Sequence, residues 1–471
     1  MADHHPERQS AIDAHGIIGD MRSAALVNDR GSVDFFCWPE FDSPSIFCSL
    51  LDTPDAGIFQ LAPDLPDARR EQIYLPDTNV LQTRWLSDHA VVEVTDLLPI
   101  GDSEDDLPVL MRRVRVVSGR ATFHMRCAVR HDYARASTRA QMADQDVVFE
   151  ATDQPALRLS SDQVMRIDAD AAVAQFSLEQ DQSAQFMLGG VDDPRFEQGA
   201  ADMCMERTLK FWRDWSGQSN YRGRWREMVN RSALALKLLT SRKHGAILAA
   251  ATFGLPETPG GGRNWDYRYT WIRDASFTVY AFMRLGFVEE AKAYMGWLRG
   301  RVSDCRGKSM KLNILYAVDG RQELPESELS HLAGHGGATP VRIGNQAYDQ
   351  VQLDIFGELM DAVYLVNKYG DAISHEGWKH AVEVVDQVCE NWQHKDVGIW
   401  EMRGEQHHFL HSRLMCWVAL DRAIRLASKR SLPAPFARWD ETRQAIYADI
   451  WNNFWNEERG HFVQYIGGPA L

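Results

Sequence analysis

The feature of this sequence that most restricts its fold is a change of hydrophobic period near residue 200. Before that point, short segments rich in β-branched or aromatic residues alternate with Gly, Asp, Ser and Pro, a pattern typical of strands; they span 91–94, 110–117, 122–129, 156–159 and 184–188. After it, apolar residues recur at helical spacing through 224–243, 273–285, 287–300, 348–369, 376–393, 410–428 and 437–456. Strands followed by a row of helices predict an antiparallel β-sandwich and then an all-α domain.

The same change of period predicts how the chain is divided. We expect a β-sandwich domain over residues 1–200, a linker helix within 201–222 and a helical domain over 223–471. Short turns join the predicted helices, except for long loops at 244–270 and 303–347. A protein of 471 residues is long enough for two such domains, each with its own core.

Charge and cysteine usage limit the setting in which the protein works. A net charge of −15 argues against nucleic acid or an anionic membrane as a partner. No segment approaches the roughly 20 apolar residues of a membrane span, and the polar N-terminus does not resemble a signal peptide. The seven cysteines are odd in number and scattered, which favours free thiols in a reducing compartment. These features predict a cytoplasmic protein and leave a homo-oligomer open.

Residues 260–274, GGGRNWDYRYTWIRD, form the most distinctive segment. Its glycines allow a tight loop, and the helical pattern that follows puts Asp274 near a helix N-terminus, which favours a negative charge. Trp can stack on the apolar face of a sugar, while Arg and Asp bond its hydroxyls. Composition alone supports this sugar-binding interpretation and a purely structural helix cap equally. A phosphate-binding P-loop is excluded, because no Gly-Lys-Ser/Thr follows the glycines.

Glu401 is the strongest candidate for a catalytic carboxyl group. Glycoside cleavage usually needs two such groups, and the acid benefits from an apolar or aromatic setting that raises its pKa. Glu401 follows Ile399 and Trp400 on a predicted loop between two helices. Glu405 is the local alternative, and on these residues alone a structural role for Glu401 is favoured.

A third polar segment spans residues 329–345 and ends at Asn345, followed by Gln346. It leads into a predicted helix, so these two amides either reach substrate hydroxyls or cap the helix. Ligand-like spacing occurs among His331, His335, His407, His408 and His411. No nearby cysteine or carboxylate set completes a zinc site, so we expect neither a metal nor another cofactor. A Ser–His–Asp site lacks its G-x-S-x-G elbow.

These segments together resemble glycoside hydrolase family 15, which contains glucoamylases, glucodextranases and some α,α-trehalases. Residues 260–274 are similar to the signature loop of the family, and 398–403 to its Leu/Ile-Trp-Glu motif. Residues 329–345 resemble its glycine-rich turn. At the other end of the chain, residues 18–39 look like the start of the trehalase-like N-terminal domain that precedes many bacterial members.

The resemblance implies roles for individual residues. Arg273 and Asp274 would hold hydroxyls of the terminal glucose, Trp271 would form a wall of the pocket, and Glu401 would be the general acid. Further substrate contacts are expected at Trp265, Trp400, Asn345 and Gln346. The implied activity is inverting, exo-acting release of glucose from α-glucosides, with trehalose slightly favoured over maltose-type glucan ends.

The family fold is an (α/α)6 barrel, and seven predicted helices are too few to complete it. The general base of the family is a second Glu on a late helix, and no matching motif occurs before Leu471. The resemblance therefore places the base beyond residue 471, which counts against turnover by these 471 residues on their own. Three alternatives remain: a phosphate-dependent α-glucoside phosphorylase, a non-catalytic sugar-binding protein, and a structural domain with no ligand.

Overall fold

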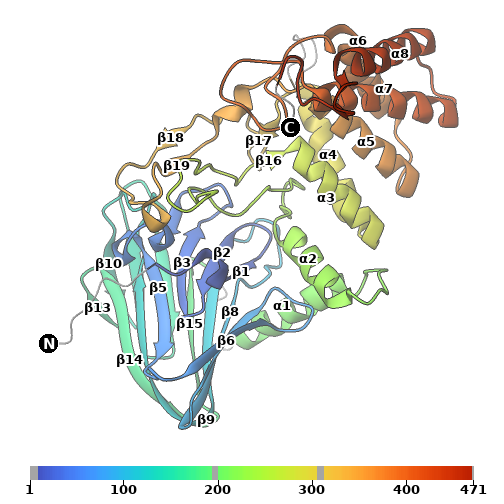
Figure 1. The fold of residues 1–471 in the computed structure, drawn as a ribbon. Coiled ribbons are helices and arrows are strands. Elements are labelled where there is room, and N and C mark those ends of the chain that lie inside the picture. Colours follow the sequence, from blue (N-terminus) through green and yellow to red (C-terminus); the bar gives the residue numbers. More distant parts are fainter. Residues whose placement is uncertain (1–8, 194–199, 305–311, 469–471) are drawn as a thin grey trace. The chain divides into compact units, whose positions relative to one another are not determined.

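A computed structural model describes residues 9–193, 200–304 and 312–468. The chain forms two compact units, each built from more than one stretch of sequence (Figure 1). Unit 1 comprises Met1–Lys243, Ala250–Arg268 and Glu326–Gly344. Unit 2 comprises His244–Ala249, Tyr269–Pro325 and Asn345–Leu471. Six cysteines are free thiols, and Cys305 lies outside the described residues.

Unit 1 is built on antiparallel strands. Its first eight are β1 (His15–Gly19), β2 (Ala24–Asn28), β3 (Ser32–Cys37), β4 (Ser45–Phe47), β5 (Ile58–Pro63), β6 (Arg69–Tyr74), β7 (Leu81–Leu86) and β8 (Ala90–Leu97). The others are β9 (Leu110–Ala128), β10 (Arg139–Ala143), β11 (Asp146–Glu150), β12 (Leu157–Ser161), β13 (Arg166–Asp168), β14 (Ala171–Glu179), β15 (Ser183–Gly190), β18 (Ser327–Glu328) and β19 (Arg342–Ile343). The main sheet runs β1-β2-β3-β5-β9-β15-β12-β11-β10.

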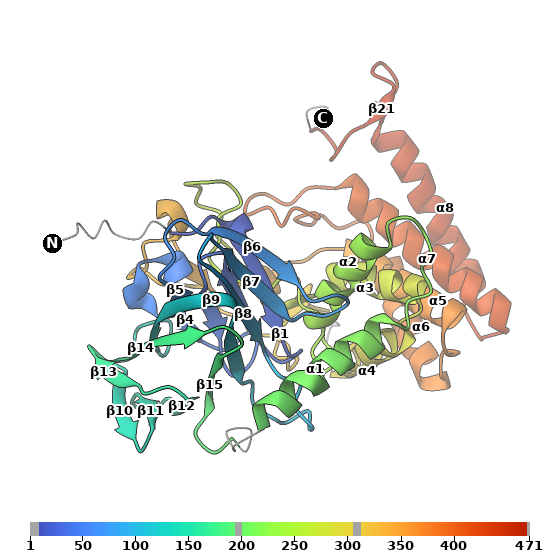
Figure 2. The same ribbon diagram turned by 90° about the horizontal axis from the view of Figure 1, so that it is seen from below.

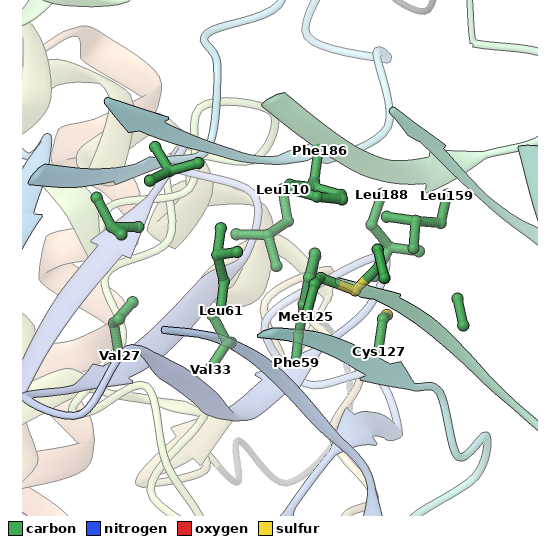
Figure 3. Close-up of a cluster of buried hydrophobic side chains, with 14 of the residues drawn as sticks. Val27, Val33, Phe59, Leu61, Leu110, Met125, Cys127, Leu159, Phe186 and Leu188 are labelled. Carbon is green, nitrogen blue, oxygen red and sulfur yellow. The ribbon is translucent and has the colours of Figure 1, made fainter. Parts of the chain in front are cut away.

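The long strand β9 joins the two layers of the sandwich. Its first half pairs with β8 and β15, and its second half pairs with β5 and β14. Apolar side chains from both layers meet between them, among them Phe59 and Leu61 on β5 and Phe186 and Leu188 on β15 (Figure 3). Burial alternates along part of β9, as expected for a strand with one face in the core: Val114 is buried and the next residue is exposed. The predicted antiparallel sandwich is confirmed.

Two stretches of the predicted helical domain pack within unit 1. In the first, Phe253 and Asp266 form an antiparallel bridge, and the fully buried Arg268 donates to both oxygens of Asp266 at 2.9 and 2.7 Å. Arg268 also donates to the Ser43 carbonyl at 2.7 Å. In the second, Gly344 N donates to Asp266 at 3.1 Å. The helical domain expected over 223–471 therefore contains segments that the sandwich unit holds.

Two helices complete unit 1, α1 (Ala200–Ser216) and α2 (Arg226–Leu238). The predicted linker helix corresponds to α1. Helix α2 is held against the turn before β7, where Asn79 Nδ2 donates to the Leu234 carbonyl at 3.0 Å. Arg231 Nη1 donates to the carbonyl of Thr78 at 2.7 Å. This helix ends five residues earlier than its apolar period suggests.

Unit 2 is mainly helical, with α3 (Ile272–Leu285), α4 (Val288–Asp304), α5 (Asp354–Tyr369), α6 (His375–Asn391), α7 (Leu410–Arg430) and α8 (Phe436–Asn453). Its short elements are β16 (Thr270–Trp271), β17 (Leu315–Tyr316), the 3₁₀ turn η6 (Gln346–Asp349), β20 (Trp455–Asn456) and β21 (His461–Phe462). Helix α5 packs between α3 and α7, while α4 packs against α3 and α6 packs against α7. Helix α8 also packs against α7, and the two lie side by side (Figure 2). The predicted partial helical barrel is confirmed.

Gly357 allows α5 and α7 to approach closely. A Cβ at this position would lie 2.3 Å from the backbone oxygen of Met415 on α7. We expect Gly357→Ala to force the two helices apart and to lower the free energy of unfolding by about 1–3 kcal/mol. The control is Gly296→Ala on α4, where an added Cβ meets nothing within 4 Å; its helix propensity should raise stability by about 0.5–1 kcal/mol. Urea unfolding of both variants checks the contrast, and an equal response would contradict it.

Candidate active site

The signature segment ends at the start of α3. Trp271 pairs with Leu315 in the β16–β17 ladder and is the N-cap of the helix, so the chain enters α3 in an extended conformation. Arg273 and Asp274 follow in the first helical turn. The Trp271 side chain is buried, whereas the Asp274 side chain is 49% exposed. Asp274 thus occupies the helix N-terminus that its sequence predicts.

Glu401 lies in a closed loop between α6 and α7. Asp396 and His407 form an antiparallel bridge across the base of this loop, with N···O distances of 3.0 and 2.9 Å. Gly398 has a φ of 68°, and a Cβ there would lie 2.9 Å from the ring of Phe409. Glu401 itself has a φ of 51°, a left-handed conformation that costs a non-glycine residue about 1–3 kcal/mol. Such strain persists only where surrounding contacts impose it.

Two residues of the signature segment meet the carboxyl group of Glu401. The indole Nε1 of Trp271 donates to Glu401 Oε1 at 2.7 Å, and Arg273 Nη2 lies 3.4 Å from the same oxygen. The side chain of Glu401 is 22% exposed. Burial raises its pKa, and the charge of Arg273 and the Trp271 hydrogen bond oppose that rise. A carboxyl group with a raised pKa next to solvent is suited to donate a proton.

Further carboxyl groups surround the guanidinium of Arg273. Its Nη1 lies 3.8 Å from Asp354 Oδ2, and its Nε lies 3.5 Å from Asp274 Oδ2. Burial raises the pKa of Asp354 to about 6, and burial together with the charge of Asp354 raises that of Glu358 to about 7. His411 Nδ1 is 3.8 Å from Asp354, and burial lowers the pKa of this imidazole. Carboxyl groups therefore outnumber cations here.

Asp354 should make stability depend on pH. Its pKa in the folded protein is about 6 against an ordinary 3.8, so its stabilising contribution is complete below the lower value and is lost as pH rises through the higher one. Asparagine keeps the shape but cannot ionise. We expect the stability of Asp354→Asn relative to the parent to be about 2–3 kcal/mol more favourable at about pH 8 than at about pH 4. Urea unfolding at both pH values tests this, with the exposed Glu405→Gln as control; a difference independent of pH would contradict it.

The other predicted contact residues lie in different settings. Trp400 is 69% exposed, next to Glu401 in the same loop. Asn345 is the N-cap of η6, where its Oδ1 accepts from Ala347 N at 3.0 Å, and Gln346 is exposed. Trp265 belongs to unit 1, in which the guanidinium of Arg342 lies 4.7 Å from its ring. Substrate contacts by these four residues stay predictions.

Several polar residues of the site were missed at the level of sequence. They are Gln350, Gln352, Asp354, Glu358 and Asp396, and His411 was singled out only as a metal-ligand candidate. Gln352 Oε1 accepts from Arg273 Nη1 at 3.3 Å, and Gln350 Nε2 lies 3.5 Å from the Glu401 carbonyl. A usable signal was the spacing of Asp354 and Glu358, four residues apart in the apolar segment 354–360, because acids are almost never fully buried unless they are paired.

Residues 9–193, 200–304 and 312–468 contain neither a cluster of metal ligands nor a membrane-spanning helix. No group of three or more His, Cys, Asp or Glu residues is arranged to hold a metal ion. No helix in these ranges is both long enough and apolar enough to cross a membrane. The histidines with ligand-like spacing have other contacts: His331 Nε2 lies 2.8 Å from the Tyr133 carbonyl, and the ring of His407 stacks on Tyr465 at 4.4 Å.

Known proteins are similar to this chain along most of its length. Residues 223–468 match the family described as "Glycosyl hydrolases family 15", and residues 5–188 match "Trehalase-like, N-terminal". The trehalase of Mycolicibacterium smegmatis is 35% identical over 98% of this chain and 72% of its own length. The trehalase of Thermoplasma acidophilum is 32% identical over 95% of this chain and 77% of its own length.

A solved structure agrees with the fold. A bacterial glucoamylase complexed with acarbose superposes with a TM-score of 0.66, covering 98% of this chain and 70% of that one. At 13% identity this likeness speaks for the fold alone. The family match over residues 223–468 and the trehalases at 35% and 32% identity carry the assignment. The chain belongs to glycosyl hydrolase family 15, as a glycoside hydrolase of the trehalase type.

Proposed function

We propose that this hydrolase releases glucose from the ends of α-glucosides with inversion of configuration, and that trehalose is preferred over maltose-type glucan ends. The observation that supports it most is the meeting of Trp271, Arg273 and Glu401 at one carboxylate oxygen, across 130 residues of sequence. The preference for trehalose is supported by the trehalase-like N-terminal match and by the trehalases among its relatives.

In the proposed reaction Glu401 is the general acid. Trp271 and Arg273 both donate to Oε1, so the proton of the neutral carboxyl group belongs on Oε2. That proton passes to the bridging oxygen as the bond from C1 to this oxygen breaks. Arg273 and Asp274, at the α3 N-terminus, bind hydroxyl groups of the terminal glucosyl unit, whose C1 is attacked. Trp271 fixes the Glu401 carboxyl group while this happens.

The second half of the reaction needs a base. Water attacks C1 from the face opposite the leaving group and gives a proton to a second carboxylate, which inverting enzymes hold roughly 6.5–9.5 Å from the acid. We propose that this base is a second glutamate of the catalytic domain, as membership of the family implies. The chain spans 72% of the length of the M. smegmatis trehalase.

The test is to follow the products of trehalose and maltose by proton NMR, with and without inorganic phosphate. Inverting hydrolysis of trehalose yields one β- and one α-glucose at first, and the two anomers then equilibrate. Glucose 1-phosphate formed only in the presence of phosphate would identify a phosphorylase instead. Saturable glucose binding without turnover, both by this chain and by a form that contains the proposed second glutamate, would identify a sugar-binding protein instead.

A further inference from the structure

Asp396 joins three segments of unit 2 through a single buried carboxylate. It is 1% exposed. Its Oδ2 accepts from Leu353 N at 2.9 Å and from Ser412 Oγ at 2.6 Å, and its Oδ1 accepts from Gly398 N at 3.2 Å. Its backbone also forms the bridge to His407 that closes the loop carrying Glu401. Three donors on one carboxylate satisfy much of its capacity as an acceptor.

Each partner of Asp396 stands next to a residue of the site. Leu353 lies between Gln352, which accepts from Arg273, and Asp354 at the start of α5. Gly398 begins the turn of Glu401, whose backbone N donates to the Gly398 carbonyl at 3.1 Å. Ser412 lies in the first turn of α7. The carboxylate therefore connects the loop of the acid to the starts of the helices beside it.

The conformation of Glu401 needs such a restraint. A glutamate in the left-handed conformation would lower its free energy by changing its φ and ψ, unless its surroundings prevent this. Other hydrogen bonds also hold the turn: Gln350 Nε2 reaches the Glu401 carbonyl at 3.5 Å, Met402 N reaches the Val397 carbonyl at 3.3 Å, and Val397 N reaches the Val351 carbonyl at 3.4 Å. Trp400 and Met402, on either side of Glu401, are exposed at 69% and 38%, so neither neighbour is buried in the core.

We propose that Asp396 is a positioning residue for the general acid: it holds the strained turn so that the Glu401 carboxyl group stays against Trp271 and Arg273. This inference rests on the proposed function for the role of Glu401, but the geometry that it describes exists without turnover. Because misplacing a catalytic group by about 1 Å can cost on the order of 10²-fold in rate, we expect Asp396→Ala to lower kcat by about that factor with a smaller change in KM.

A spectroscopic readout follows the geometry directly. In protein labelled with ¹⁵N-tryptophan, the indole N–H signal of Trp271 is identified by its loss in Trp271→Phe. Glu401→Ala defines the position of this signal without its carboxylate partner. We expect Asp396→Ala to move the signal most of the way to that position. We expect Asp396→Asn, which keeps an oxygen for Leu353 N and the Ser412 hydroxyl but faces Gly398 N with an amide, to give an intermediate shift and to restore part of kcat.

Asp386→Ala is the matched control. Asp386 on α6 accepts from Trp439 Nε1 at 3.1 Å, so its loss also destabilises unit 2. It should lower the melting temperature without moving the Trp271 signal or kcat. If Asp396→Ala folds and leaves the Trp271 signal in place, or if Asp386→Ala moves it equally, the positioning role is wrong. A parent protein without turnover whose Trp271 signal responds as expected would instead refute the proposed function alone.

Discussion

Glu401→Gln should lower kcat for glucose release by about 10²–10⁴-fold, with little change in KM. Glutamine can present its carbonyl oxygen to Trp271 and Arg273 as Oε1 does now, so the site keeps its shape. It has no proton to give to the bridging oxygen. The measurement is steady-state hydrolysis of trehalose by a form of the enzyme that contains the proposed second glutamate. Glu405→Gln, in an exposed part of the same loop, should retain the parent rate.

An activated substrate separates loss of the proton from loss of the site. Fluoride departs from α-glucosyl fluoride with little need of acid catalysis, so Glu401→Gln should retain far more of the parent rate on this substrate than on trehalose. An equal loss on both substrates would mean that the variant has lost binding geometry, and Glu401 would then not be the acid. A loss confined to Glu405→Gln would transfer the role to that residue.

Arg268→Met should destabilise unit 1 by about 3–5 kcal/mol, because it leaves the fully buried carboxylate of Asp266 without its cation. For a unit of this size, that corresponds to a fall in melting temperature of about 10 °C. The variant also loses the hydrogen bonds to the Ser43 carbonyl and the Tyr133 hydroxyl. Thermal unfolding followed by circular dichroism measures the change.

Two further variants test whether the unpaired carboxylate of Asp266 causes the loss of stability. Arg263→Ala removes an arginine from the same segment, but its side chain is 65% exposed and its pair with Glu257 is a surface pair, so the effect should stay within about 0.5 kcal/mol. Adding Asp266→Asn to Arg268→Met removes the buried charge and should recover part of the loss. If the double variant is less stable than Arg268→Met, the explanation is wrong.

Local pattern was enough to predict the fold class and part of the site. The periods of two and 3.6 identified the sandwich and the helices, and the start of α3 placed Asp274 near a helix N-terminus. The helix expected over 348–369 begins only at Asp354, because η6 ends at Asp349 and the non-helical residues 350–353 follow it. Asn345 shows a further limit of sequence patterns. An amide side chain before a helix has the same sequence signature whether it caps the helix or binds a substrate.

What the sequence did not reveal depends on contacts between distant residues. Arg268 belongs to unit 1 because of Tyr133 and Ser43, which lie 135 and 225 residues away. Similarly, Asp396 has an ordinary local sequence, and only folding brings the backbone N–H of Leu353, 43 residues away, to its carboxylate. Periodicity within a window of about 18 residues carries no record of such pairs.

The interleaving of the two units limits how members of this family can be recombined. A chimera that joins one sandwich to another helical domain at a single crossover near residue 223 would separate 250–268 and 326–344 from the unit that holds them. Buried groups such as Asp266 and Arg268 would then face a surface that did not evolve with them. A functional exchange between relatives should therefore transfer 250–268 and 326–344 together with the sandwich. The segments that must be exchanged together are those in contact, although they are not continuous in the gene.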